Sequence, residues 1–69
     1  MINKRFEEYR LIKGLKVKEL ADIIGISQGS LSDIKNEKTD PKAETIEKFA
    51  LNTDVNPIWL LTGKGPMTI

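Results

Sequence analysis

The side chains that could recognise nucleic-acid bases lie close together, between residues 27 and 36. If this stretch is a helix with Leu31 and Ile34 turned inward, its polar residues face outward. An outward glutamine such as Gln28 can bond to N6 and N7 of adenine, and a carboxylate such as Asp33 can accept from N4 of cytosine. The residues expected to contact bases are Gln28, Gly29, Ser32 and Asp33.

Two of these four positions have alternative interpretations. The Asp33 carboxylate would repel phosphates, and it could instead face solvent at the edge of the groove or pair with a lysine. Gly29 costs roughly 1 kcal/mol in a helix relative to alanine. Close approach of the backbone to DNA or to the preceding helix would explain this glycine, and a tolerated glycine without a role is the other possibility.

The composition argues against enzymatic chemistry. The 69 residues include no histidine and no cysteine, which excludes Cys/His zinc sites and Ser-His or Cys-His catalysis. The carboxylates form no catalytic motif, and Gly63-Lys64-Gly65 lacks the spacing of a phosphate-binding loop. We expect no enzymatic activity, no cofactor, no metal site and no small-molecule substrate.

Length and hydropathy predict one small domain, residues 1–69. Apolar residues make up 39% of the chain and charged residues 30%, as in globular domains. No apolar run approaches the ~20 residues needed to span a bilayer, and none near the N-terminus resembles a signal peptide. We therefore expect a cytoplasmic protein without a membrane partner.

The charges are distributed unevenly although the net charge is only +1. Residues 1–18 contain six basic and two acidic side chains, whereas residues 19–56 contain four basic and eight acidic ones. This asymmetry could mark an electrostatic face, or it could be ordinary solvated surface.

Capping residues and apolar spacing predict three helices in the first half of the chain and no strands. Asn3 is placed to cap a first helix, which Gly14 ends. A second helix is expected over residues 17–24, and Ser27 is placed to cap a third helix that runs to about Lys35.

The second half of the chain is expected to add two further helices. Asp40-Pro41 would begin a fourth helix, and Asn56-Pro57 a short fifth helix over residues 58–62, before a short tail over residues 64–69. The side chains expected to face the core are Phe6, Tyr9, Leu20, Ala21, Ile24, Ile26, Leu31, Ile34, Ile46, Phe49 and Ala50, with Ile2 and Ile12 as further candidates.

The link between the second and third helices is the most informative local feature. Only a few residues around Gly25 join them, so the two helices must cross steeply. Ala21 is small where the helices would approach, and Gly25 suits a left-handed turn. Residues 17–36 therefore fit a helix-turn-helix. The alternative is that two amphipathic helices merely pack at a glycine turn.

A family resemblance extends over residues 2–67. The chain resembles the Cro/repressor-type (Xre-like) helix-turn-helix family in GLKVKELA (14–21), GIS (25–27), SLSDI (30–34), NEKTDP (36–41) and TIEKFA (45–50). Its end, VNPIWLLTGKGPM (55–67), resembles the close of phage-repressor DNA-binding domains. The resemblance implies an all-α, five-helix, lambda-repressor-like domain that binds operator DNA, commonly as a symmetric dimer.

The resemblance also implies where the DNA backbone is held. The second helix starts beside Lys16 and Lys18, and its N–H groups could themselves hold a phosphate. Other matching positions flank the third helix. The residues assigned to phosphate contacts are Arg10, Lys16, Lys18, Ser27, Ser30, Asn36, Lys38 and Lys42.

Three positions depart from the family pattern. Val17 replaces a polar residue, which removes one DNA contact. Glu37 replaces the usual glycine after the third helix and adds a negative charge there. Lys35 stands where many members carry a glutamate that pairs with the arginine matching Arg10. Arg10 therefore needs another partner, and Glu37 or a DNA phosphate are the candidates.

The short fifth helix predicts a dimer contact. Residues 58–61 are four consecutive apolar residues, and successive side chains point ~100° apart on a helix. At least one must stay exposed, and Ile58 and Leu61 are the candidates because the resemblance turns Trp59 and Leu60 inward. A two-fold dimer would place its recognition helices ~34 Å apart, so the operator should be an inverted repeat.

The function predicted is sequence-specific binding of double-stranded DNA by a transcriptional repressor of phage or prophage type. One alternative is an antitoxin or a restriction-modification controller that uses the same domain. The other is a protein-interaction module whose third helix binds another protein.

Overall fold

The computed structural model describes all residues 1–69 and is built from five helices, as predicted. Their bounds are α1 Ile2–Ile12, α2 Val17–Ile24, α3 Gln28–Lys35, α4 Ala43–Asn52 and α5 Pro57–Thr62. The only β-type pairing is an isolated bridge between Val55 and Thr68. None of the helices combines the length and apolarity that crossing a membrane requires.

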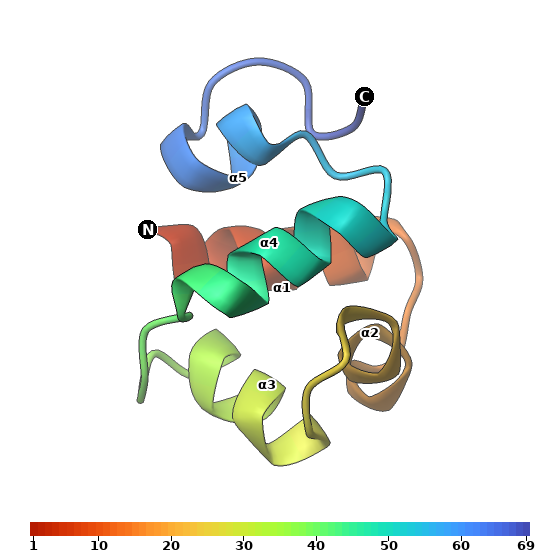
Figure 1. The fold of residues 1–69 in the computed structure, drawn as a ribbon, viewed down its shortest axis with the longest axis vertical. Coiled ribbons are helices and arrows are strands. Elements are labelled where there is room, and N and C mark those ends of the chain that lie inside the picture. The colour runs from red at the N-terminus through yellow and green to blue at the C-terminus, as the bar shows by residue number, and fades with distance from the viewer.

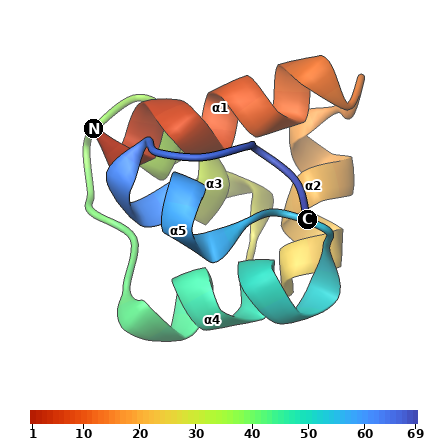
Figure 2. The same ribbon diagram turned by 90° about the horizontal axis from the view of Figure 1, so that it is seen from above.

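The helices surround one core in an elongated molecule of 29 × 20 × 20 Å. Figure 1 shows α5 at one end of the long axis and the α2–α3 pair at the other. Seen from above, α1 and α4 lie on opposite sides of the core (Figure 2). The pair α2–α3 therefore forms one whole end of the molecule and is open to a large partner.

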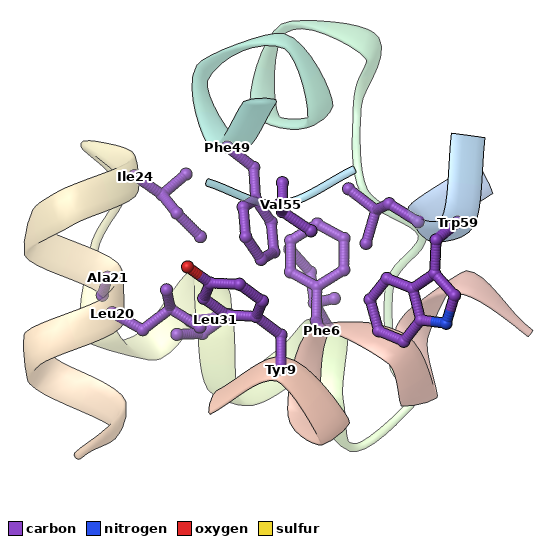
Figure 3. Close-up of a cluster of buried hydrophobic side chains, with 11 residues drawn as sticks. Phe6, Tyr9, Leu20, Ala21, Ile24, Leu31, Phe49, Val55 and Trp59 are labelled. Atoms are coloured by element: carbon purple, nitrogen blue, oxygen red, sulfur yellow. The ribbon is translucent and has the colours of Figure 1, made fainter. Parts of the chain in front are cut away.

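The core is centred on three aromatic rings. Phe49 lies edge-on to Phe6 and Tyr9, with ring centroids 4.8 and 5.0 Å apart respectively (Figure 3). Such edge-to-face pairs contribute about 0.5–1.5 kcal/mol each beyond the area that they bury. The buried hydrophobic residues are Phe6, Tyr9, Leu20, Ala21, Ile24, Leu31, Ile34, Phe49, Val55, Trp59 and Leu60.

Most of the predicted core positions are confirmed. Ile2, Ile26, Ile46 and Ala50 are half-buried. Ile12 was the wrong candidate, because it is 64% exposed at the end of α1 beyond the core. Val55, which lies between helices and so belongs to no apolar periodicity, is fully buried.

The corner between α2 and α3 has the predicted geometry. Gly25 adopts a left-handed backbone (φ 88°) and its N–H donates to the carbonyl of Ala21. Ser27 then caps α3, since its hydroxyl accepts from the N–H of Ser30 at 3.0 Å. Because only three residues separate the two helices, the direction of α3 is fixed as soon as α2 is packed.

Two predicted helix starts are wrong. Asn3 does not cap α1, which already begins at Ile2. Its side-chain amide instead donates to the carbonyl of Ile34, near the C-terminal end of α3. Asp40-Pro41 does not open α4, because the backbone of Lys42 is still extended (ψ 157°) and the helical hydrogen bonds begin with the N–H of Ile46 and the carbonyl of Lys42.

The tail over residues 64–69 folds back onto the start of α5. The N–H of Asn56 donates to the carbonyl of Met67, and the N–H of Ile69 to that of Asp54. At its start α5 is capped as predicted, by the side chain of Asn56. At its other end Arg5 donates to the carbonyls of Leu60 and Leu61. The tail and α1 thus hold α5 in place.

Replacing the buried Asn3 should destabilise the fold. Its side-chain amide donates to the carbonyls of Ile34 and Thr39, both at 2.9 Å. Asn3→Ala leaves these carbonyls without their donor, so we expect a loss of about 2 kcal/mol in the free energy of unfolding. Urea unfolding followed by circular dichroism measures it.

The matched control is Asn52→Ala. Asn52 is exposed and makes one bond of the same kind, to the carbonyl of Ile23 at 3.0 Å. Water can replace that bond, so the control should lose less than about 1 kcal/mol. Equal losses in the two variants would show that Asn3 does not carry the role assigned to it.

Candidate nucleic-acid interface

The structure brings the four predicted base-contacting residues together on α3. Leu31 and Ile34 are buried in the core, as expected. On the rest of the helix, Gln28 and Gly29 are exposed at its N-terminal end, and Ser32 and Asp33 are half-buried one turn further on. The N-terminal turns of a recognition helix are the part that reaches base edges.

The hydroxyls of Ser27 and Ser30 are bonded to each other at 2.8 Å. The Ser27 oxygen also accepts from the N–H of Ser30, so its first role is to cap α3. Both residues are exposed, and the phosphate contacts assigned to them stay predictions.

The structure excludes one of the three explanations for the glycine at position 29. Its backbone has an ordinary helical φ, and a Cβ built there would meet no atom within 4 Å. Packing against α2 therefore does not require a glycine. Close approach of the backbone to DNA and a tolerated glycine without a role are the explanations that remain.

Asp33 forms no ion pair, so the pairing with a lysine considered above does not occur. It borders a pocket of about 260 Å³ between α3, the following loop and α4. The pocket is lined by Ile26, Ser30, Asp33, Ile34, Thr39, Asp40, Lys42 and Thr45. With a second carboxylate and one lysine at its rim, this part of the surface is not strongly basic.

Exposed lysines precede α2 and follow α3 in the chain. Lys16 precedes α2, and Lys38 and Lys42 lie in the loop beyond α3, all three exposed and outside any ion pair. Lys18 is paired with Asp22 at 2.9 Å, both well exposed, so solvent weakens the pair. Asn36, at the C-cap of α3, is exposed as well.

The start of α2 holds a carboxylate that the sequence prediction left out. Glu19 accepts from the N–H of Lys16 at 2.8 Å. It takes up one of the N–H groups at the helix start where the resemblance places a phosphate. The signal was present in the sequence, because an acidic residue at the third helical position commonly caps in this way.

The partner of Arg10 is Glu7 and not Glu37, so that expectation was wrong. The Arg10 guanidinium donates to the Glu7 carboxylate on the same helix and to the carbonyl of Leu15 at 2.7 Å. The second Glu7 oxygen lies 3.2 Å from the Lys35 ammonium. The hydrogen bond from Arg10 holds the pKa of Glu7 below its ordinary value, and Glu7 raises that of Arg10.

This pairing also bears on the phosphate contact predicted for Arg10. Its guanidinium is mostly covered and turned toward Glu7 and Leu15. The geometry gives no support to a role for Arg10 at the DNA backbone, and Arg10 acts instead as a link between α1 and the turn before α2.

Glu37 takes the left-handed conformation expected of the glycine that it replaces. Its φ is 60°, and no other non-glycine residue of the chain has a positive φ. Directly after it, the N–H of Lys38 donates to the carbonyl of Asp33 and closes the end of α3. The backbone of this turn is thus one that suits glycine, and the side chain of Glu37 is unfavourable there.

Glu37→Gly should therefore stabilise the protein. A glycine adopts this backbone without steric cost, and we expect a gain of about 0.5–1 kcal/mol in the free energy of unfolding. Thermal unfolding measures the change. Lys38→Gly, the control at a neighbouring position with negative φ, should lose stability. A loss in Glu37→Gly as large as in the control would contradict this account of the turn.

The predicted dimer residues are exposed on one face of α5. Ile58 and Leu61 are 60% and 51% exposed and lie three positions apart, so they share a face. Trp59 and Leu60 are buried, as expected.

Comparisons with known proteins agree with this fold. A family model described as a helix-turn-helix domain matches residues 3–66. Two curated relatives, the HTH-type transcriptional regulators SinR of Bacillus licheniformis and of Bacillus subtilis (strain 168), are each 37% identical over 65 residues. These residues are 93% of this chain and 59% of each relative.

A solved structure resembles the chain in three dimensions as well. In a complex of the SinR and SinI proteins, the matched chain superposes with a TM-score of 0.79 at 33% identity. The match covers 90% of this chain and 61% of that one. The chain thus spans about three-fifths of the length of the proteins that it matches.

Proposed function

This chain belongs to the helix-turn-helix domain family, of the Xre-like kind, and we propose that it binds double-stranded DNA by sequence to control transcription. The observation that carries the proposal is the placement of α3. Its apolar residues are buried in the core while Gln28 and Gly29 stand exposed at its N-terminal end. A helix held in this way fits the major groove with its first turns against the bases.

The proposed contacts divide into two groups. Base contacts come from Gln28, Ser32 and Asp33, with Gly29 allowing close approach of the helix backbone. Phosphate contacts come from residues on both sides of α3. The second group consists of Lys16, Lys18, Ser27, Ser30, Asn36, Lys38 and Lys42.

The finer assignment is a repressor of phage or prophage type, acting in the cytoplasm. Its support is the resemblance of residues 55–67 to the close of phage-repressor DNA-binding domains. Antitoxins and restriction-modification controllers use the same domain, so the genes beside the selected DNA sequence distinguish these roles. A protein partner is a second candidate function, because the solved relative is a complex of SinR with SinI.

Selection on random duplex DNA, followed by two single variants, tests the proposal. Gln28→Ala should lose about 1–3 kcal/mol of binding free energy and relax the preference at one base pair. Lys38→Ala should weaken binding to all duplexes alike, because a phosphate contact carries no sequence information. Fluorescence anisotropy titration measures both. Failure to enrich any sequence would contradict the proposal, and equal losses on every sequence from Gln28→Ala would contradict its role in base recognition.

We further propose that two copies bind an inverted repeat through the α5 face that carries Ile58 and Leu61. So small an apolar patch buries less surface than a stable interface needs, and the dimer should therefore form on DNA rather than in solution.

Titration of a half-site against the full palindrome tests the dimer. We expect two protomers per full site and tighter binding of the second copy than of the first. Ile58→Asn should abolish this gain while leaving half-site affinity unchanged, since α5 lies at the other end of the molecule from α3 (Figure 1). Complex mass, measured by native mass spectrometry, gives the stoichiometry. One protomer per full site would rule out the dimer.

A further inference from the structure

One face of α1 is polar and points to the helix-turn-helix. Asn3, Glu7 and Arg10 are spaced four and three residues apart, and such positions share a helix face. Asn3 donates to the carbonyl of Ile34, and Glu7 contacts Lys35, so both bind the last turn of α3.

Glu7 is the centre of this arrangement because both of its oxygens are used. One accepts from Arg10, and the other lies 3.2 Å from the ammonium of Lys35. Arg10 in turn donates to the carbonyl of Leu15, just before α2. A single carboxylate on α1 is therefore connected to the entry of α2 and to the end of α3.

The burial of the three charged groups makes the connection stronger than a surface ion pair. The side chains of Arg10, Glu7 and Lys35 are only 16%, 25% and 27% exposed. Without the carboxylate, the Arg10 guanidinium and the Lys35 ammonium would both lose the anion that they contact, and the end of α3 would lose its ion pair to α1.

We propose that Glu7 is a positioning residue for DNA recognition, which it serves by holding α3 against α1 through Lys35. The inference rests on the proposed function of α3. Base contacts require side chains held to within about 0.5 Å of their productive position. A recognition helix of eight residues transmits a shift at its end to its first turn. By pairing with Lys35, Glu7 also prevents that lysine from binding DNA phosphates, a contact that would add affinity for every sequence alike.

Glu7→Gln tests the inference, with Glu8→Gln as the matched control. Both variants remove one negative charge from adjacent positions of α1, but Glu8 is exposed and forms no ion pair. We expect Glu7→Gln to weaken binding to the selected operator about tenfold. Binding to an unrelated duplex should stay unchanged or rise. The control should leave the ratio of the two affinities as in the wild type.

Two further variants separate positioning from loss of structure. The exchange Glu7→Lys with Lys35→Glu restores one ion pair between α1 and α3, and it should recover operator affinity relative to Glu7→Lys alone. Lys35→Gln breaks the link to α3 while Arg10 keeps its partner, and it should lower the affinity ratio in the same direction as Glu7→Gln. All titrations are made where circular dichroism shows each variant folded.

The outcomes distinguish this inference from the proposed function. Equal operator affinities for Glu7→Gln and Glu8→Gln, or parallel losses on operator and unrelated duplex, would overturn the positioning role alone. Failure of the exchange to recover affinity would do the same. A wild-type protein that binds no duplex would overturn the proposed function and this inference with it.

Discussion

The burial of Phe49 between Phe6 and Tyr9 is the interaction on which the other parts of the structure depend. Phe6 and Phe49 are fully buried, and the rings join α1 to α4 while Leu20 and Ile24 of α2 point toward them (Figure 3). Truncating a buried aromatic ring costs about 3–5 kcal/mol, which is comparable to the whole stability of so small a domain. The steep corner of α2 and α3 is stable because this shared core buries the apolar faces of both helices.

Polar contacts fix the orientation of α3, which the apolar core alone does not fully determine. Hydrophobic contact is not directional, so burying Leu31 and Ile34 alone would still allow α3 to slide or rotate slightly. Asn3 and Glu7 each bond to the end of α3 at a defined point. The apolar core thus supplies most of the stability of the fold, and Asn3 and Glu7 fix where the end of α3 lies against α1.

How far the sequence predicts this structure depends on how local each signal is. Gly25 and Ser27 act within their own turn, so the predicted bounds of α2 and α3 agree with those observed. Asn3 and Asp40 have side chains suited to capping, but the amide of Asn3 bonds to α3 and α4 starts later. Glu7 and Arg10 lie three residues apart on α1, a spacing that pairs opposite charges on a helix, so the sequence carried a signal for this partner that the prediction did not use. The contact of Glu7 with Lys35 joins two helices, and no local spacing gives it. The face of α3 was predictable from Leu31 and Ile34, whereas the contacts to DNA involve a second molecule and stay predictions.

The dependence of DNA affinity on salt tests the central claim most directly, namely that α3 and the flanking lysines form a DNA-binding surface. Lysines bound to phosphates release counterions, so log affinity should fall linearly with log salt concentration. We predict a loss of about two orders of magnitude or more between ~50 and ~200 mM salt for a complex of two protomers on the selected duplex. An affinity that hardly changes over this range would contradict the claim and favour a protein partner for α3.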